Sequence, residues 1–90
     1  MEEMSKYEQN LVKARALKDV GESIESSMEW CKSCINDYED NLEEYEKKKA
    51  NGEEVSDYEI RYARSNKSEY EERLRFWEIA KAAIDKELMF

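Results

Sequence analysis

Two cysteines in the segment Cys31-Lys-Ser-Cys34 are the side chains of this chain best suited to metal or redox chemistry. A Cys-x-x-Cys pair supplies two thiolate ligands, whereas zinc needs four, usually completed by more cysteines or by histidines. The chain has no histidine and no third cysteine. We therefore expect packed, unreactive thiols, with two alternatives: a metal site shared by two copies, and a redox pair.

Together with the preceding Trp30, the motif resembles the Trp-Cys-x-x-Cys redox site of thioredoxins over five residues. That redox site needs a strand-to-helix junction, where the helix N-terminus lowers the pKa of the first thiol. Here the motif falls inside a predicted helix and beside acidic residues, which raise a thiol pKa. The context therefore favours packed thiols over redox work.

Other catalytic chemistry has little to build on. Without histidine there is no Ser-His or Cys-His pair to activate a nucleophile, and the two glycines form no phosphate-binding loop. Carboxylates are abundant, but acid–base catalysis also needs a desolvating cleft. We expect a protein that is not an enzyme, with no catalytic residue, cofactor or metal of its own.

The most informative cluster is a run of acidic residues with no base among them. Its members are Asp37, Glu39, Asp40, Glu43, Glu44 and Glu46. Like charges four residues apart destabilise a helix by about 0.2–0.5 kcal/mol per pair, which supports a functional role for the run beside that of a solvated surface. A row of carboxylates on a rod can imitate a phosphate backbone, as in DNA-mimic inhibitors. The run and nearby Trp30 are the predicted partner-binding residues, and a solvated coiled-coil surface is the alternative.

The net charge of −8 is concentrated in one segment. Residues 19–46 hold ten acids and one base, residues 1–18 have a balance of +1, and residues 47–90 are neutral. This distribution argues against direct binding to nucleic acid or to an anionic membrane. It favours a protein partner with a basic surface.

Apolar residues recur at steps of three and four, which predicts long helices. Between Ile24 and Tyr45 the spacing is a strict heptad, with Met28, Ile35 and Leu42 at one position and Ile24, Cys31, Tyr38 and Tyr45 at the other. Charged residues make up 42% of the chain and proline is absent, which also suits long helices. The predicted fold is all-α, a long antiparallel helical hairpin that resembles a coiled coil, in one domain spanning residues 1–90.

Capping signals set the expected boundaries. Ser5-Lys-Tyr-Glu8 has the pattern of a capping box, and Lys47-Lys48-Lys49 followed by Asn51-Gly52 is typical of a helix end. Ser56-Asp-Tyr-Glu59 forms a second capping box. We therefore predict helices over about 5–50 and 56–88, joined by a turn at 51–55.

Gly21 leaves two alternatives for the first helix. It shares the heptad position of Met28, so a continuous helix keeps its phase, at a cost of about 1 kcal/mol relative to alanine. Alternatively the chain bends or breaks at 19–23, and residues 5–18 fold back as a short third helix. We favour the continuous helix.

Folding the chain about the turn places residues whose numbers sum to about 105 opposite one another. Gly21 then faces Ile84, and Leu17 faces Leu88. Residues 1–16 overhang and need cover, either from the third helix or from a homodimer that forms a four-helix bundle.

The second helix carries features that one partner helix cannot satisfy. Lys67 and Lys81 interrupt its apolar stripe, and their aliphatic stems are expected to line the seam. A weak helical stretch at 65–68 marks a candidate kink. An additional apolar face supports a second function, a structural or assembly adaptor. Its residues are Tyr58, Tyr62, Phe76 and Ile79.

The cellular location and the biological origin of the protein are indicated only by weaker features of the sequence. The chain has no apolar run of about 20 residues that would span a membrane, and Met1-Glu-Glu-Met4 does not resemble a signal peptide. With two free cysteines, this predicts a cytoplasmic protein. A small, acidic, helical, histidine-free and tyrosine-rich chain resembles the accessory proteins of bacteriophages and mobile elements. That resemblance implies an inhibitor of a host nucleic-acid-binding or defence protein.

Overall fold

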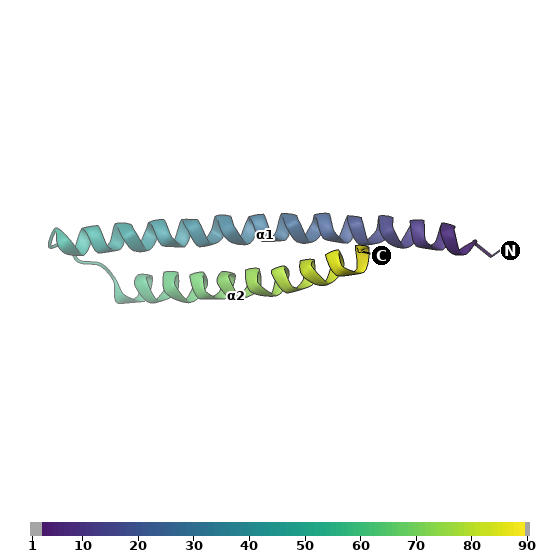
Figure 1. Ribbon diagram of the computed structural model, residues 1–90. Coiled ribbons are helices and arrows are strands. Elements are labelled where there is room, and N and C mark those ends of the chain that lie inside the picture. Colours follow the sequence, from purple (N-terminus) through teal and green to yellow (C-terminus); the bar gives the residue numbers. More distant parts are fainter. Residues whose placement is uncertain (1–2, 90) are drawn as a thin grey trace.

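The computed structural model describes residues 3–89, which form two helices, α1 (Lys6–Ala50) and α2 (Asp57–Leu88). The helices lie side by side and run in opposite directions (Figure 1), so the predicted antiparallel hairpin is confirmed. The molecule is a rod with extents of 74 × 24 × 14 Å. Within residues 3–89 the rod has one helix–helix seam and no second layer.

Both ends of α1 follow the local signals in the sequence. At the N-terminus, the backbone N–H of Glu8 donates to the side-chain oxygen of Ser5 at 3.1 Å, as an N-cap requires. At the C-terminus, Gly52 adopts a left-handed φ of 79°. The backbone N–H groups of Glu53 and Gly52 donate to the carbonyls of Lys48 and Lys49 at 3.0 and 3.1 Å, forming a Schellman motif.

The helix runs without a break through Gly21, so the structure adopts the continuous alternative. A Cβ placed on Gly21 would lie 3.6 Å from Cγ2 of Ile84, an ordinary van der Waals contact. The predicted alignment of the two helices, in which Gly21 faces Ile84, is therefore correct at this position. In residues 3–89 no third helix folds back from 19–23.

The start of α2 corrects one expectation. Ser56 precedes the helix, but its side chain makes no capping hydrogen bond, so the second capping box is wrong in its chemistry. The helix also continues through 65–68, where Asn66 donates from Nδ2 to the carbonyl of Tyr62 at 3.0 Å. A capping pattern in sequence is therefore not sufficient to create a cap.

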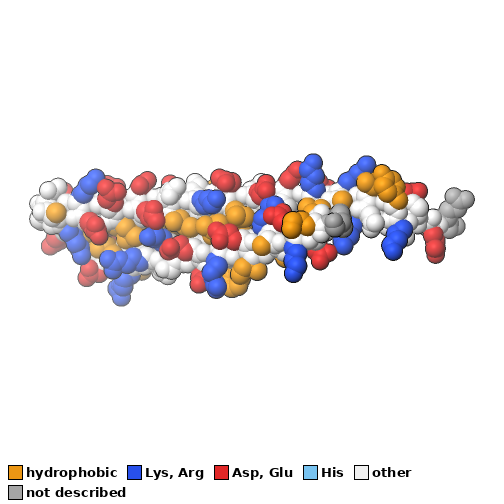
Figure 2. Space-filling view, viewed as in Figure 1, with side chains coloured by type: hydrophobic (Ala, Val, Ile, Leu, Met, Phe, Trp, Pro, Cys, Tyr) orange, Lys and Arg blue, Asp and Glu red, His pale blue; other side chains and the backbone are white. Residues whose placement is uncertain are grey.

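The core is thin. Within residues 3–89 the buried hydrophobic residues are Ile24, Cys31, Cys34 and Ala63. The remaining heptad residues between Met28 and Tyr45 are half-buried along the seam, which appears as a band of hydrophobic side chains between the helices (Figure 2). Charged side chains of both signs line the outer surface in this view. No helix of the described chain is long and apolar enough to cross a membrane.

Two lysines complete the seam as expected. The side chains of Lys67 and Lys81 are 29% and 22% exposed. Their Nζ atoms reach across to α1 and pair with Glu39 at 3.5 Å and with Glu25 at 3.3 Å. The stems therefore fill apolar space while the charges are satisfied at its edge.

The N-terminal part of α1 extends beyond α2 (Figure 1). The Lys13–Glu87 ion pair, at 3.1 Å, lies near the last level at which the two helices touch. Tyr7, Leu11 and Val12 are exposed on this overhang. The overhang leaves apolar surface that a single hairpin does not cover.

Candidate functional site

The predicted partner-binding residues of the acidic run lie on the last four turns of α1, and together they are called the acidic surface. All of its six side chains are exposed, and none occupies the helix–helix seam. The members are Asp37, Glu39, Asp40, Glu43, Glu44 and Glu46. A straight, well-capped helix therefore presents these carboxylates on a rigid support.

Lysines from outside the run neutralise part of this surface. Besides the Lys67–Glu39 pair, Lys47 lies 3.4 Å from Glu43 and Lys48 lies 3.7 Å from Glu44. Pairs this exposed contribute about 0–1 kcal/mol each, so a competing cation can displace them. The run contains no base in the sequence, but in the folded chain three of its carboxylates form ion pairs with lysines from outside the run.

The acidic surface divides into two parts. Glu39 and Glu46 flank the seam, and Glu46 borders a hollow shared with Lys49 and Arg64. The other four carboxylates point away from α2. Within the described chain the ion pairs include neither Asp37 nor Asp40, so these two outward carboxylates are not neutralised by a salt bridge.

Trp30 borders the outward part of the acidic surface. It occupies the same heptad position as Asp37 and Glu44, so the three lie in one row along α1. Its side chain is 64% exposed, which is unusual for a tryptophan without a partner. An aromatic ring beside a row of carboxylates suits a partner that carries arginine.

The second predicted interface on α2 is not one continuous patch. Tyr58 and Tyr62 stack on each other near the turn, with ring centroids 6.2 Å apart. Phe76 lies fourteen residues further along, or about 21 Å along the helix, under the guanidinium of Arg75 at 5.0 Å. Phe76 and Ile79 therefore form a separate exposed patch.

Both cysteines are buried and free. Burial raises the pKa of the Cys31 thiol, the adjacent Cys34 raises it further, and Arg73 lowers it. Residues 3–89 contain no group of three or more histidines, cysteines or acids placed to hold a metal. Cys34 was not assigned to the heptad seam, but it lies three residues from Cys31 and so shares its face.

Alkylation of these thiols is expected to be slow in the folded protein at pH 7. A raised pKa keeps Cys31 in the unreactive thiol form, and burial blocks access of the reagent. The rate should therefore rise with pH only above the ordinary thiol range, and unfolding in urea should raise it at least about 100-fold. Rapid alkylation of the native chain at pH 7 would contradict packed thiols.

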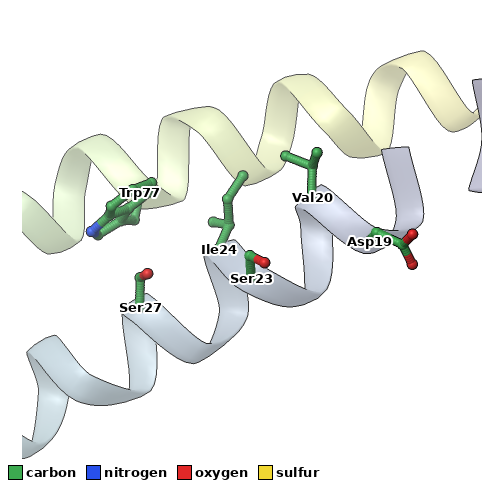
Figure 3. A pocket seen from close by; sticks show the side chains of 6 residues that line it. All are labelled: Asp19, Val20, Ser23, Ile24, Ser27 and Trp77. Atoms are coloured by element: carbon green, nitrogen blue, oxygen red, sulfur yellow. The ribbon is translucent and has the colours of Figure 1, made fainter. Parts of the chain in front are cut away.

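Sequence patterns also missed a groove on one side of the seam, here called the serine groove. It has a volume of about 320 Å³ and opens where Ser23 and Ser27 leave space beside Trp77 (Figure 3). Val20 and Ile24 point toward α2, while Asp19 points away from the gap. The signal that would have indicated the groove is two small residues four positions apart beside the seam.

Lys81, whose stem lines the seam as expected, also makes two ion pairs that the sequence did not indicate. Its Nζ donates to Asp85 at 2.6 Å and pairs with Glu25 of α1. The hydrogen bond to Asp85 is the main cause that raises the pKa of Lys81, against the opposing effect of burial. The arrangement clamps α2 to α1 next to Gly21.

These sites are an acidic surface with one bordering tryptophan, two aromatic patches, a buried thiol pair and an apolar groove. None combines a nucleophile, a base and a cleft. Comparison of the chain with protein-family models, with curated proteins and with solved structures finds no match.

Proposed function

We propose that this chain is a non-enzymatic binding module whose acidic surface engages a protein with a basic surface. A nucleic-acid-binding or defence protein that the module inhibits or regulates fits this chemistry. The supporting observation is the outward part of the acidic surface, where the ion pairs of the described chain include neither Asp37 nor Asp40. Carboxylates held in this way keep their charge available to a partner.

The charge density supports imitation of nucleic acid. Residues 37–46 span about 14 Å of helix, which gives about one carboxylate per 2.3 Å. One DNA strand carries a charge about every 3.4 Å and the duplex about every 1.7 Å. Before the weak lysine pairs are counted, the acidic surface lies between these two densities.

The intramolecular lysines do not prevent such binding. The pairs with Lys47 and Lys48 are more than 3 Å long and their partners are exposed. A partner that supplies several arginines makes bidentate contacts with carboxylates, which are stronger than single lysine contacts. The partner's arginines therefore replace these lysines without a large cost to the hairpin.

Charge reversal tests this function. A variant carrying Glu39→Lys, Asp40→Lys, Glu43→Lys and Glu44→Lys is expected to lose capture of its partner from a bacterial lysate. The wild-type chain should capture the partner at low salt and release it at high salt, because exposed charges are screened. Affinity measured on the captured partner should fall at least about 100-fold in the variant.

A matched control reverses four acids that lie outside α1, Glu53 in the turn and Glu59, Glu71 and Glu78 in α2, and so makes the same change in net charge. This control is expected to retain capture. The adaptor alternative is favoured by the exposed patch of Phe76 and Ile79. It predicts that alanine at these two positions abolishes capture and that reversal of the acidic surface does not. If alanine at these two positions abolishes capture while reversal of the acidic surface does not, the acidic surface is not the binding site.

A further inference from the structure

The serine groove continues into a second hollow on the same side of the hairpin. This second hollow has a volume of about 400 Å³ and is lined by Phe76 and Ala80 of α2, and Trp77 lines both hollows. The two hollows, joined at the indole of Trp77, are together called the furrow. Trp77 and Phe76 are 37% and 60% exposed, so the furrow presents aromatic surface to solvent.

Trp30 lies on the same side of the hairpin. It follows Ser27 by three residues and Ser23 by seven, so the three side chains leave α1 in similar directions. The alignment of the hairpin places Trp30 level with residue 75, between Arg73 and Trp77. Each helix therefore contributes one exposed tryptophan to the side that carries the furrow.

Acidic residues stand at the two ends of this side of α1. Asp19 and Asp37 are 18 residues apart, which is five full turns, so their side chains leave the helix in the same direction about 27 Å apart. Both are exposed, and the ion pairs of the described chain include neither. Asp37 also belongs to the acidic surface, so the furrow leads into that surface. Between the two acids this side of α1 is uncharged, with Ser23, Ser26, Ser27, Trp30 and Ser33.

We propose that the furrow holds an amphipathic helix of the basic partner, with its apolar face against the two tryptophans. The inference rests on the proposed function and names the part of the partner that binds beside the acidic surface. Apolar side chains at helical spacing fill the two hollows, in the way that amphipathic helices bind hydrophobic grooves. Bases about 18 residues apart in the partner helix pair with Asp19 and Asp37.

Charge complementarity selects this occupant. An acidic helix would be repelled at both ends of the furrow, and a neutral one would gain nothing there. A second copy lying along α1 would bring the ten acids and one base of its own residues 19–46 against the same set. In the middle of the furrow, Arg73 already pairs with Glu69 at 3.5 Å and lies over the ring of Tyr70. The middle therefore suits apolar side chains and the ends suit bases.

Fluorescence of the two tryptophans in the chain tests this occupant with a defined probe. The probe is a synthetic helix of leucine, alanine and arginine, with leucines on one face and arginines at both ends. Its binding should shift tryptophan emission to shorter wavelength, because leucine side chains displace water from the indoles. A peptide of the same composition whose leucines are scattered around the helix should bind at least about 10-fold more weakly. Equal binding of the two peptides would overturn the proposal.

Ser23→Arg tests where the probe binds. Ser23 is exposed and lines the groove, so the added guanidinium fills the groove and repels the arginines of the probe. The Kd of the probe should rise at least about 10-fold. Ser68→Arg is the matched control, because Ser68 is exposed, lies two and a half turns from Trp77 and faces the opposite direction. Its Kd should equal that of wild type, and equal Kd values for the two variants would overturn the proposal.

Reversal of the two end carboxylates tests the charge pattern without changing the groove. Asp19→Lys combined with Asp37→Lys should raise the Kd of the arginine probe at least about 10-fold. The same variant should bind a probe with glutamine at both ends as wild type does. At physiological salt, where distant charges are screened, Glu71→Lys combined with Glu78→Lys on another face of α2 should change neither Kd. An unchanged Kd of the arginine probe in the Asp19 and Asp37 variant would overturn the proposal.

Two further measurements separate this inference from the proposed function. If reversal of the acidic surface abolishes partner capture and Ser23→Arg does not, the proposed function stands and the furrow is not part of the site. If capture survives that reversal while the probe still binds the furrow, the proposed function fails and the furrow remains a site for basic helices. A wild-type chain that sediments as a dimer, and that Ser23→Arg converts to a monomer, would place a second copy in the furrow and overturn the proposal.

Discussion

Ile24→Ala is expected to destabilise the hairpin by about 2–5 kcal/mol, the range for truncation of a buried isoleucine. Ile24 is 6% exposed and is the largest of the four buried hydrophobic residues of the described chain. Small domains have a total stability of about 5–15 kcal/mol, so the loss is a large fraction of it. Urea denaturation followed by far-ultraviolet circular dichroism should show a lower midpoint.

Ile79→Ala is the matched control, since Ile79 is 56% exposed on the outer side of α2. The same atoms are removed there without leaving a cavity, and the expected change is within about 0.5 kcal/mol. If both substitutions lowered the free energy of unfolding equally, packing in the seam beside Gly21 would not be the main source of stability. Equal losses would indicate that Ile79 is buried against something else in solution.

Alanine at the two glycines is expected to act in opposite directions. Gly21→Ala should stabilise the hairpin by about 1 kcal/mol, because alanine favours the helix and its Cβ would meet Ile84 at an ordinary 3.6 Å. Gly52→Ala should destabilise it by about 1–2 kcal/mol, because its φ of 79° is left-handed and strained for alanine. Thermal melts of the two variants, compared with wild type, check both signs.

The two variants serve as controls for each other, since each replaces one hydrogen by a methyl group. Around Gly52 no atom lies within 4 Å of the added Cβ, so any loss there comes from the backbone and not from a clash. A destabilised Gly21→Ala would mean that Ile84 and Lys81 cannot accommodate even a methyl group. Gly21 would then be required for close helix contact.

The sequence predicts the hairpin register because apolar spacing and turn chemistry point to the same alignment. The pairing of Gly21 with Ile84 follows from it, as do two contacts that were not predicted. Glu25–Lys81 and Glu39–Lys67 both have numbers that sum to 106. Applying the same alignment to charged residues would have found these ion pairs.

Other features depend on side-chain geometry that spacing does not encode. Ser56 has the right neighbours for a capping box, yet its rotamer makes no capping bond. Cys34 is buried because the contact stripe of α1 is wider than the two heptad positions. The serine groove is missed for the same reason, since it lies between helices at the edge of the seam.

The acidic surface was predictable as a set of exposed carboxylates but not as an electrostatic surface. A linear count sees no base between Asp37 and Glu46, whereas lysines one turn along α1 and across on α2 lie within 4 Å of three of the six. Likewise the face of Tyr62 and Phe76 is continuous on a helical projection but is divided by 21 Å, or about four turns, in space. A helical projection shows the direction of each side chain around the helix axis, but it does not show how far apart two residues lie along that axis.

The single seam of the hairpin has a consequence for its dynamics. Each turn of α1 packs against one turn of α2. Contacts near Gly52 therefore join residues that are close in sequence, whereas the contact of Gly21 with Ile84 joins residues that are 63 positions apart. Closing the near contacts costs less chain entropy, so the hairpin should close from the turn toward the free ends like a zipper and reopen in reverse. Amide protons beside Ile84 should then exchange with solvent sooner than those beside Ile60, although both residues lie in the same helix.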